Sequence, residues 1–231
     1  MDTQLQKLQI LLGTTFNDTN YLLSAITHRS YLNENRTATQ AHNERLEFLG
    51  DAVLELVVTD YLFALYPDKA EGELTAIRAA LVNTNTLSET STALGINEFL
   101  LLSKGESKDE GRARQYILAN TFESIVGAIY LDQGYDAARD FIASQLFSRT
   151  ENIVDKRLWQ DAKSRFQERA QEKTGITPAY KTLREQGPDH DRVFTVGVFL
   201  GDVLVAEGEG RAKQEAEQVA AENGLKERGW M

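Results

Sequence analysis

The sequence predicts two domains, an all-α domain over residues 1–152 and a small α+β domain of order α-β-β-β-α over residues 158–231. Through the first 150 residues apolar side chains recur at helical spacing, with one proline and no convincing alternating strand. After residue 157 the period changes, and three short β-like runs lie between two helical stretches. This order predicts an antiparallel sheet with both helices packed on one face.

In the first domain, the helices are delimited by breaker and loop signals. Leucines at helical spacing near the N-terminus indicate a first helix, and Tyr21, Leu22 and Ile26 indicate a second. The clearest further helices span residues 44–65, which Pro67 follows, 72–82, and 116–132, which Gly134 ends. The polar segments 32–43 and 103–114 are predicted to be loops.

In the second domain, a helix is predicted over residues 161–173 and a final helix over residues 211–227. The β-like runs between them are 179–186, 192–200 and 203–210. Gly201 and Asp202 are a hairpin signal between the last two runs, because this dipeptide suits a tight turn between antiparallel strands.

The charge of the chain is unevenly distributed. The formal net charge is −10; residues 1–150 hold 20 Asp and Glu against 12 Lys and Arg, a net of −8, and residues 151–231 hold 15 against 13, a net of −2. An acidic first domain either repels nucleic acid or holds divalent cations that bridge to phosphate, and composition does not choose between the two. No apolar run suits a membrane span, no secretory signal is evident, and the lack of cysteine favours the cytoplasm.

The strongest chemical signal is the segment ERLEFLGDAVLEL, residues 44–56. Four acids occur at i, i+3, i+7 and i+11, and therefore form one stripe on a helix that is otherwise apolar: Glu44, Glu47, Asp51 and Glu55. A solvated outer face is the ordinary interpretation of such a run, but a solvated face usually mixes signs. A divalent cation would relieve the repulsion, so the spacing favours a metal site.

The same segment resembles the nuclease signature of the ribonuclease III family, and the string ERLEFLGDA is highly specific. The resemblance continues through THRSYLNE (27–34), YPDKAEGELTAIRAALV (66–82), LSKGE (102–106) and NTFESIVGAIYLD (120–132), and the C-terminal part resembles the family's double-stranded RNA-binding domain. It implies a homodimeric, Mg²⁺-dependent endonuclease, with Mn²⁺ as a substitute, that processes ribosomal and messenger RNA precursors. The implied products carry 5′-phosphate and 3′-hydroxyl ends.

The resemblance also assigns roles to residues of the first domain. Asp51 and Glu123 match catalytic acids, and the metal ligands match Glu47, Asp51, Asn120 and Glu123. Glu44 and Glu71 match acids that line the same cleft. Phe48 matches an aromatic residue that plugs the partner subunit, although ordinary core packing would also explain it. For His28 and His42 we expect packing or capping roles, since hydrolysis through metal ions needs no nucleophilic side chain.

One position departs from the family pattern, because Asn120 stands where an aspartate is usual. An amide offers a cation one oxygen and no charge. The alternative function is therefore a catalytically impaired, non-enzymatic double-stranded RNA-binding protein of the same descent. Retention of the other acids favours the enzyme.

In the second domain, Ser164, Gln167, Glu168 and Gln171 share one helix face, which suits the 2′-hydroxyls of the RNA minor groove. Without the rest of the motif, an ordinary exposed helix face would be the preferred interpretation. The resemblance adds His190, in the segment GPDHDR, and the start of the final helix, with Arg211 and Lys213, as RNA contacts. Ala212-Lys213-Gln214 replaces the usual Ser-Lys-Lys, so we expect weaker and less salt-sensitive binding.

Overall fold

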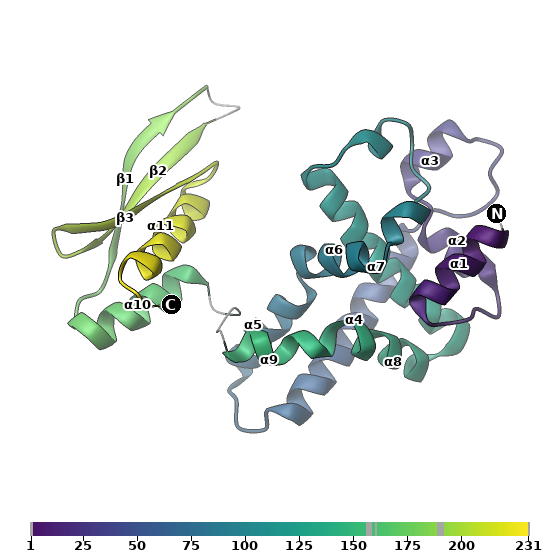
Figure 1. Ribbon diagram of the computed structural model, residues 1–231, viewed down its shortest axis with the longest axis horizontal. Coiled ribbons are helices and arrows are strands. Elements are labelled where there is room, and N and C mark those ends of the chain that lie inside the picture. Colours follow the sequence, from purple (N-terminus) through teal and green to yellow (C-terminus); the bar gives the residue numbers. More distant parts are fainter. Residues whose placement is uncertain (1, 156–158, 160, 189–191, 231) are drawn as a thin grey trace. The chain divides into compact units, whose positions relative to one another are not determined.

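The computed structural model describes residues 2–155, 159, 161–188 and 192–230 (Figure 1). The chain forms two compact units, residues 1–159 and 160–231. The first is helical and the second combines a sheet with helices, which confirms the predicted fold class. The domain limits at residues 152 and 158 stay predictions, and residue 158 lies outside the described residues.

The first unit consists of α-helices and short 3₁₀ helices. Its elements are α1 (Asp2–Leu12), α2 (Thr19–Ala25), α3 (Arg29–Glu34), α4 (Glu44–Leu65), α5 (Glu71–Val82), α6 (Thr84–Ala93), η1 (Ile96–Phe99), η2 (Glu106–Lys108), α7 (Arg112–Gln133), α8 (Tyr135–Leu146), η3 (Phe147–Arg149) and α9 (Thr150–Asp155). The helix predicted over residues 44–65 is confirmed. The predicted loops are partly wrong, because α3 enters the first of them and η2 and the start of α7 lie in the second.

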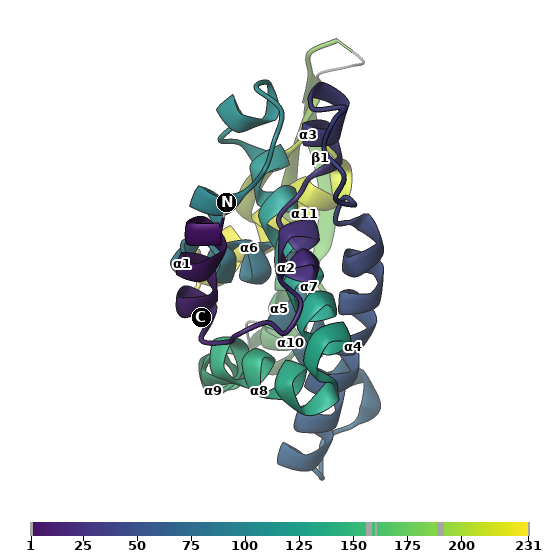
Figure 2. The same ribbon diagram turned by 90° about the vertical axis from the view of Figure 1, so that its right-hand side faces the viewer.

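The core of this unit is centred on α4 and α7, which lie against each other along much of their length (Figure 2). Two glycines make this contact close. A Cβ atom built on Gly50 of α4 would lie 1.8 Å from the carbonyl oxygen of Glu123, and one on Gly127 of α7 would lie 2.3 Å from that of Leu46. Only residues without side chains allow the two backbones to approach this closely.

The start of α4 is tied to distant backbone. The N–H of Asn43 donates to the carbonyl oxygen of Thr27 at 2.9 Å, and Thr27 forms a parallel β-bridge with Leu101. In that bridge the His28 N–H donates to the Leu101 carbonyl at 3.0 Å. Three separate stretches of chain therefore meet just before the acidic stripe begins.

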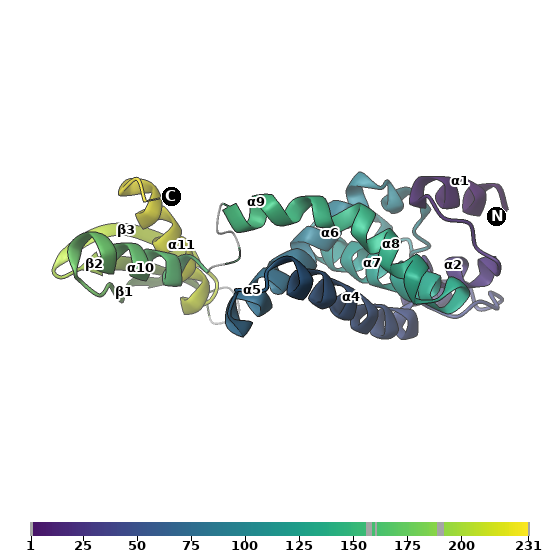
Figure 3. The same cartoon turned by 90° about the horizontal axis from the view of Figure 1, so that it is seen from below.

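The second unit has the order α10 (Ala162–Thr174), β1 (Ala179–Gln186), β2 (Val193–Leu200), β3 (Val203–Gly210) and α11 (Lys213–Glu227). The strands form an antiparallel sheet in the order β1-β2-β3, as predicted, and the final helix begins two residues later than predicted. Val198 and Leu200, two residues apart on β2, share a core with Phe166 of α10 and Ala220 of α11. Both helices therefore pack on one face of the sheet (Figure 3).

Gly208 on β3 allows α11 to approach the sheet. A Cβ atom at this position would lie 2.2 Å from the backbone nitrogen of Ala220.

Among the described residues, no helix is both long and apolar enough to cross a membrane.

Candidate active site and RNA-binding surface

The contact between α4 and α7 brings together the acids predicted to bind metal and to act in catalysis. Glu47 and Asp51 project from α4, and Glu123 projects from the turn of α7 whose backbone meets Gly50. Burial, together with the nearby charges of Asp51 and Glu47, raises the pKa of Glu123 to about 8. A half-buried carboxyl group that faces two others at this crossing is therefore protonated near neutral pH when no cation is present.

Asn120 lies one turn before Glu123 on α7 and reaches the same cluster. Burial raises the pKa of Glu47, and the charges of Glu44 and Asp51 act in the same direction, while a hydrogen bond from the Asn120 side chain lowers it. The amide therefore stabilises the ionised form of Glu47. An aspartate at this position would add a negative charge to the cluster instead.

The cluster fits a hard divalent cation by its chemistry. Its donors are three carboxylates and one amide oxygen, the oxygen ligands that Mg²⁺ prefers, and their mutual repulsion is what a cation would relieve. Within the part of the chain that the structure describes, no three His, Cys, Asp or Glu side chains already converge as a metal site. The donor set is present, and the four side chains are neighbours across one helix contact.

Glu44 lies at the exposed end of the stripe. Its carboxylate is 3.6 Å from the Arg29 guanidinium and 3.8 Å from the His42 ring, and its side chain is half exposed. The acidic spacing did not predict these partners, because residues 29 and 42 precede α4 and are brought to it by the bonds around Thr27.

The structure places Glu71 away from this cluster. Glu71 begins α5, accepts a hydrogen bond from the Thr75 hydroxyl at 3.1 Å, and lines a surface hollow with Phe63 and Arg78. Asp51 and Phe63 are twelve residues apart on α4, which corresponds to roughly 18 Å along a helix axis. Within one chain, Glu71 therefore does not share a cleft with Glu44.

Phe48 is 82% exposed, so it is not part of the core of a single chain. Leu56 and Phe63, on the same side of α4, are also more than half exposed. Next to Phe63, the hollow that includes Glu71 has a volume of about 420 Å³ and is lined mainly by apolar surface. The exposed side of α4 thus carries an apolar stripe, and an apolar hollow lies beside it between α4 and α5.

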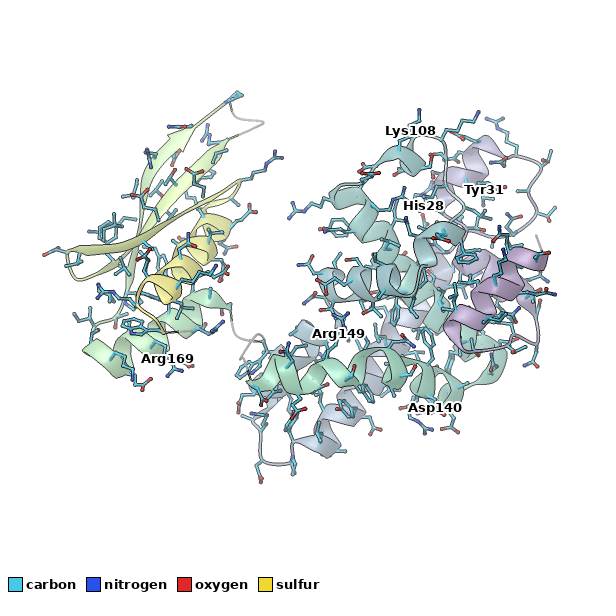
Figure 4. The ribbon with its side chains drawn as sticks, viewed as in Figure 1. His28, Tyr31, Lys108, Asp140, Arg149 and Arg169 are labelled. Atoms are coloured by element: carbon cyan, nitrogen blue, oxygen red, sulfur yellow. The ribbon has the colours of Figure 1, made fainter. Side chains whose placement is uncertain are left out.

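His28 has the capping role that the sequence predicts. Its ring nitrogen Nδ1 accepts the backbone N–H of Ser30 at 3.3 Å and so caps α3. Burial lowers its pKa, so the neutral ring is favoured. Figure 4 shows His28 and Lys108 at the same end of the first unit, far from Asp140.

In the second unit the predicted polar face of α10 is confirmed as one surface. Ser164, Gln167, Glu168 and Gln171 line an open hollow of about 570 Å³ together with Glu172. The Ser164 hydroxyl donates to the Asp161 carboxylate at 2.7 Å, which fixes the start of this helix. The predicted contact His190 lies outside the described residues.

At the start of α11, protein carboxylates lie close to the Lys213 side chain and to the backbone of Arg211. Lys213 Nζ is 3.1 Å from Glu185 Oε1, and the backbone N–H of Arg211 donates to Glu215 at 2.9 Å.

The two units together define a class of protein that joins a hydrolytic site to a duplex-RNA-binding module. The helical unit has the acidic cluster across two helices, and the sheet unit has the polar helix face.

Comparison with known proteins agrees with this class. A family model described as "Ribonuclease-III-like" matches residues 18–150, and one described as "Double-stranded RNA binding motif" matches residues 162–228. A Ribonuclease 3 of Desulforamulus reducens is 41% identical over 96% of this chain and 90% of the relative, and one of Carboxydothermus hydrogenoformans is 45% identical over 94% and 93%. The solved nuclease domain of ribonuclease III from Campylobacter jejuni is 39% identical, with a TM-score of 0.55, over 61% of this chain and 97% of that one.

The chain belongs to the ribonuclease III family and is an endonuclease of double-stranded RNA. Members of this family need divalent metal ions.

Proposed function

We propose that the chain is an active, Mg²⁺-dependent endonuclease that processes ribosomal and messenger RNA precursors in the cytoplasm and leaves 5′-phosphate and 3′-hydroxyl ends. The observation that carries the proposal is the meeting of Glu47, Asp51 and Glu123 at the contact between α4 and α7, where burial and the neighbouring charges raise the pKa of Glu123 to about 8. Acids this costly to bring together are typical of a functional site.

The metal ligands in this proposal are Glu47, Asp51, Asn120 and Glu123, and the catalytic acids are Asp51 and Glu123. A bound divalent cation would supply charge neutralisation on the phosphate and a lower pKa for a water molecule. Glu123 holds a proton in the metal-free site up to about pH 8, so ligation would release that proton. Mn²⁺, which binds such ligands more tightly, is the expected substitute.

The proposed active form is a homodimer through the exposed stripe of α4. In a symmetric pair each copy can offer Phe48 of α4 as a knob and the hollow beside Phe63, between α4 and α5, as its socket. If Phe48 of one copy entered the hollow of the other, the acidic stripe next to Phe48 would lie close to the Glu71 that lines that hollow. The cleft predicted for Glu44 and Glu71 would then form only between two copies. The solved Campylobacter jejuni nuclease domain has a region that is reported to be involved in dimer formation.

The second unit, with limits proposed at residues 158–231, would hold the RNA. The polar face of α10 would contact the minor groove through Ser164, Gln167, Glu168 and Gln171, and the start of α11 would meet phosphates through Arg211 and Lys213. His190 completes the proposed set from the intervening segment.

The second candidate function is RNA binding without cleavage, and only Asn120 favours it. A cleavage assay on a long RNA duplex with Mg²⁺, with Mn²⁺ and with a chelator distinguishes the two. We expect cleavage with either metal, loss of cleavage with the chelator, and loss in Glu123→Gln. Glu98→Gln, an equal charge change at an exposed position in η1, serves as the control. Duplex binding without cleavage under any condition would establish the alternative.

A further inference from the structure

Glu185, near the end of β1, contacts cations from two segments that are proposed to bind RNA. Its Oε1 atom is 3.1 Å from Lys213 Nζ, at the start of α11, and its Oε2 atom is 3.7 Å from Arg192 Nη1, next to β2. The side chains of Glu185, Lys213 and Arg192 are 41%, 56% and 41% exposed. One carboxylate therefore joins the start of α11 to the segment before β2, at a surface that solvent and ligands reach.

The strand register holds this contact in place. Glu185 pairs with Phe194 across β1 and β2, and Lys213 Nζ is 5.4 Å from the centroid of the Phe194 ring. The carboxylate and the ring are adjacent because the sheet places them so, and Lys213 lies over both. The ion pair is thus built on fixed backbone.

A second carboxylate occupies the start of the same helix. Glu215 accepts the backbone N–H of Arg211 at 2.9 Å, and such N–H groups at a helix start are donors that a phosphate would otherwise use. The end of α11 that is proposed to face RNA is therefore partly neutralised by the protein's own acids.

We infer that Glu185 occupies, in the RNA-free protein, the place beside Lys213 that an RNA phosphate takes in the complex. This inference rests on the proposed role of Lys213. RNA binding then replaces the Glu185 carboxylate beside Lys213 with a phosphate. Fewer counterions are released in this exchange than when a phosphate binds a lysine that has no carboxylate partner. The consequences are a lower affinity for duplex RNA and a salt dependence that is shallower than the number of basic residues implies.

The test is duplex binding by the full chain carrying Glu185→Gln, in a chelator that prevents cleavage, between 0.05 and 0.2 M monovalent salt. Glutamine keeps the size and an acceptor atom but removes the charge. We expect tighter binding and a slope of log affinity against log salt that is steeper by up to about 0.9, so that the tightening is about 3.5-fold greater at the low salt than at the high salt. Glu222→Gln is the matched control, since Glu222 pairs with Lys226 at 2.8 Å on the same helix.

Lys213→Ala completes the comparison as a double-mutant cycle. In the Glu185→Gln background, Lys213→Ala should make the slope of log affinity against log salt shallower by about 0.9. In the natural sequence the same substitution should change the slope by less. The inference is overturned if Glu185→Gln binds no more tightly than Glu222→Gln, or if it leaves the slope unchanged. If Lys213→Ala leaves binding intact in both backgrounds, the proposed RNA contact itself is wrong, and the two failures are thereby distinguished.

Discussion

Gly50 of α4 lies so close to Glu123 of α7 that a Cβ atom on it would stand 1.8 Å from the Glu123 carbonyl oxygen. Gly50→Ala should therefore push the two helices apart. Overpacking costs about 1–3 kcal/mol, and the gain in helix propensity of about 1 kcal/mol does not offset it. We expect a lower free energy of unfolding in denaturant, and a higher Mg²⁺ concentration for half-maximal cleavage.

Gly72→Ala is the control for this change. Gly72 is exposed in α5 and has nothing within 4 Å of a built Cβ atom. The variant should be as stable as the natural chain or slightly more stable. Equal losses in both variants would show that the close approach at Gly50 is not what holds the site.

The substitution Asn120→Asp tests the departure from the family pattern. It removes the hydrogen bond that stabilises ionised Glu47 and adds a charge to the cluster, so cation affinity should rise. We expect an unchanged affinity for duplex RNA, a lower Mg²⁺ concentration for half-maximal cleavage, and a smaller advantage of Mn²⁺ over Mg²⁺. The measurement is a metal titration of the cleavage rate beside Asn97→Asp, which adds the same charge at an exposed position in η1. Coincident curves for Asn120→Asp and the natural chain would contradict the ligand role.

The raised pKa of Glu123 predicts how stability depends on pH in a chelator. Its pKa is about 8 in the folded chain and near 4.5 in the unfolded chain, so the folded state holds the extra proton between these values. Stability should therefore fall as pH rises from about 4.5 to 8, by up to about 1.4 kcal/mol per pH unit. Glu123→Gln should flatten this fall, and added Mg²⁺ should restore most stability at the alkaline end. Unfolding curves at several pH values check both, and an equally steep fall in the variant would assign the effect to another group.

Removal of the Phe48 ring should weaken the proposed dimer. Phe48→Ala takes an 82% exposed aromatic from α4, so the folded monomer should lose little stability while association weakens. Sedimentation of the full chain measures this. Ile10→Ala, 79% exposed on α1, is the control and should leave association unchanged. An undiminished dimer in Phe48→Ala would place the interface elsewhere.

The long helices and the three strands could be predicted because each repeats its period several times. The short helix α3 and the polar helix α6 could not. The six residues of α3 are too few to show a period and depend on the His28 cap. The buried face of α6, TNTLSETSTA, consists mostly of polar side chains, so it shows no apolar period. One of them, Ser91, donates its hydroxyl to the Leu118 carbonyl at 2.8 Å.

The candidate site was predicted in part. Spacing alone placed Glu47 and Asp51 on one face of α4, but which helix lies opposite depends on where two backbones can meet. Gly50 and Gly127 decide that, and nothing in a one-dimensional pattern pairs them. The family resemblance supplied Glu123 and Asn120. The catalytic and ligand roles stay predictions.

The backbone bonds around Thr27 have a consequence for how this chain can vary. The segment between α3, which ends at Glu34, and Asn43 is held at both ends: the Asn35 N–H donates to the Tyr31 carbonyl, and the Asn43 N–H donates to that of Thr27. Extra residues there would cost little, about 0.6 kcal/mol for each doubling of the loop. We therefore expect this excursion to accept insertions, including a reporter peptide, while Glu47 keeps its place four residues beyond the second fastening.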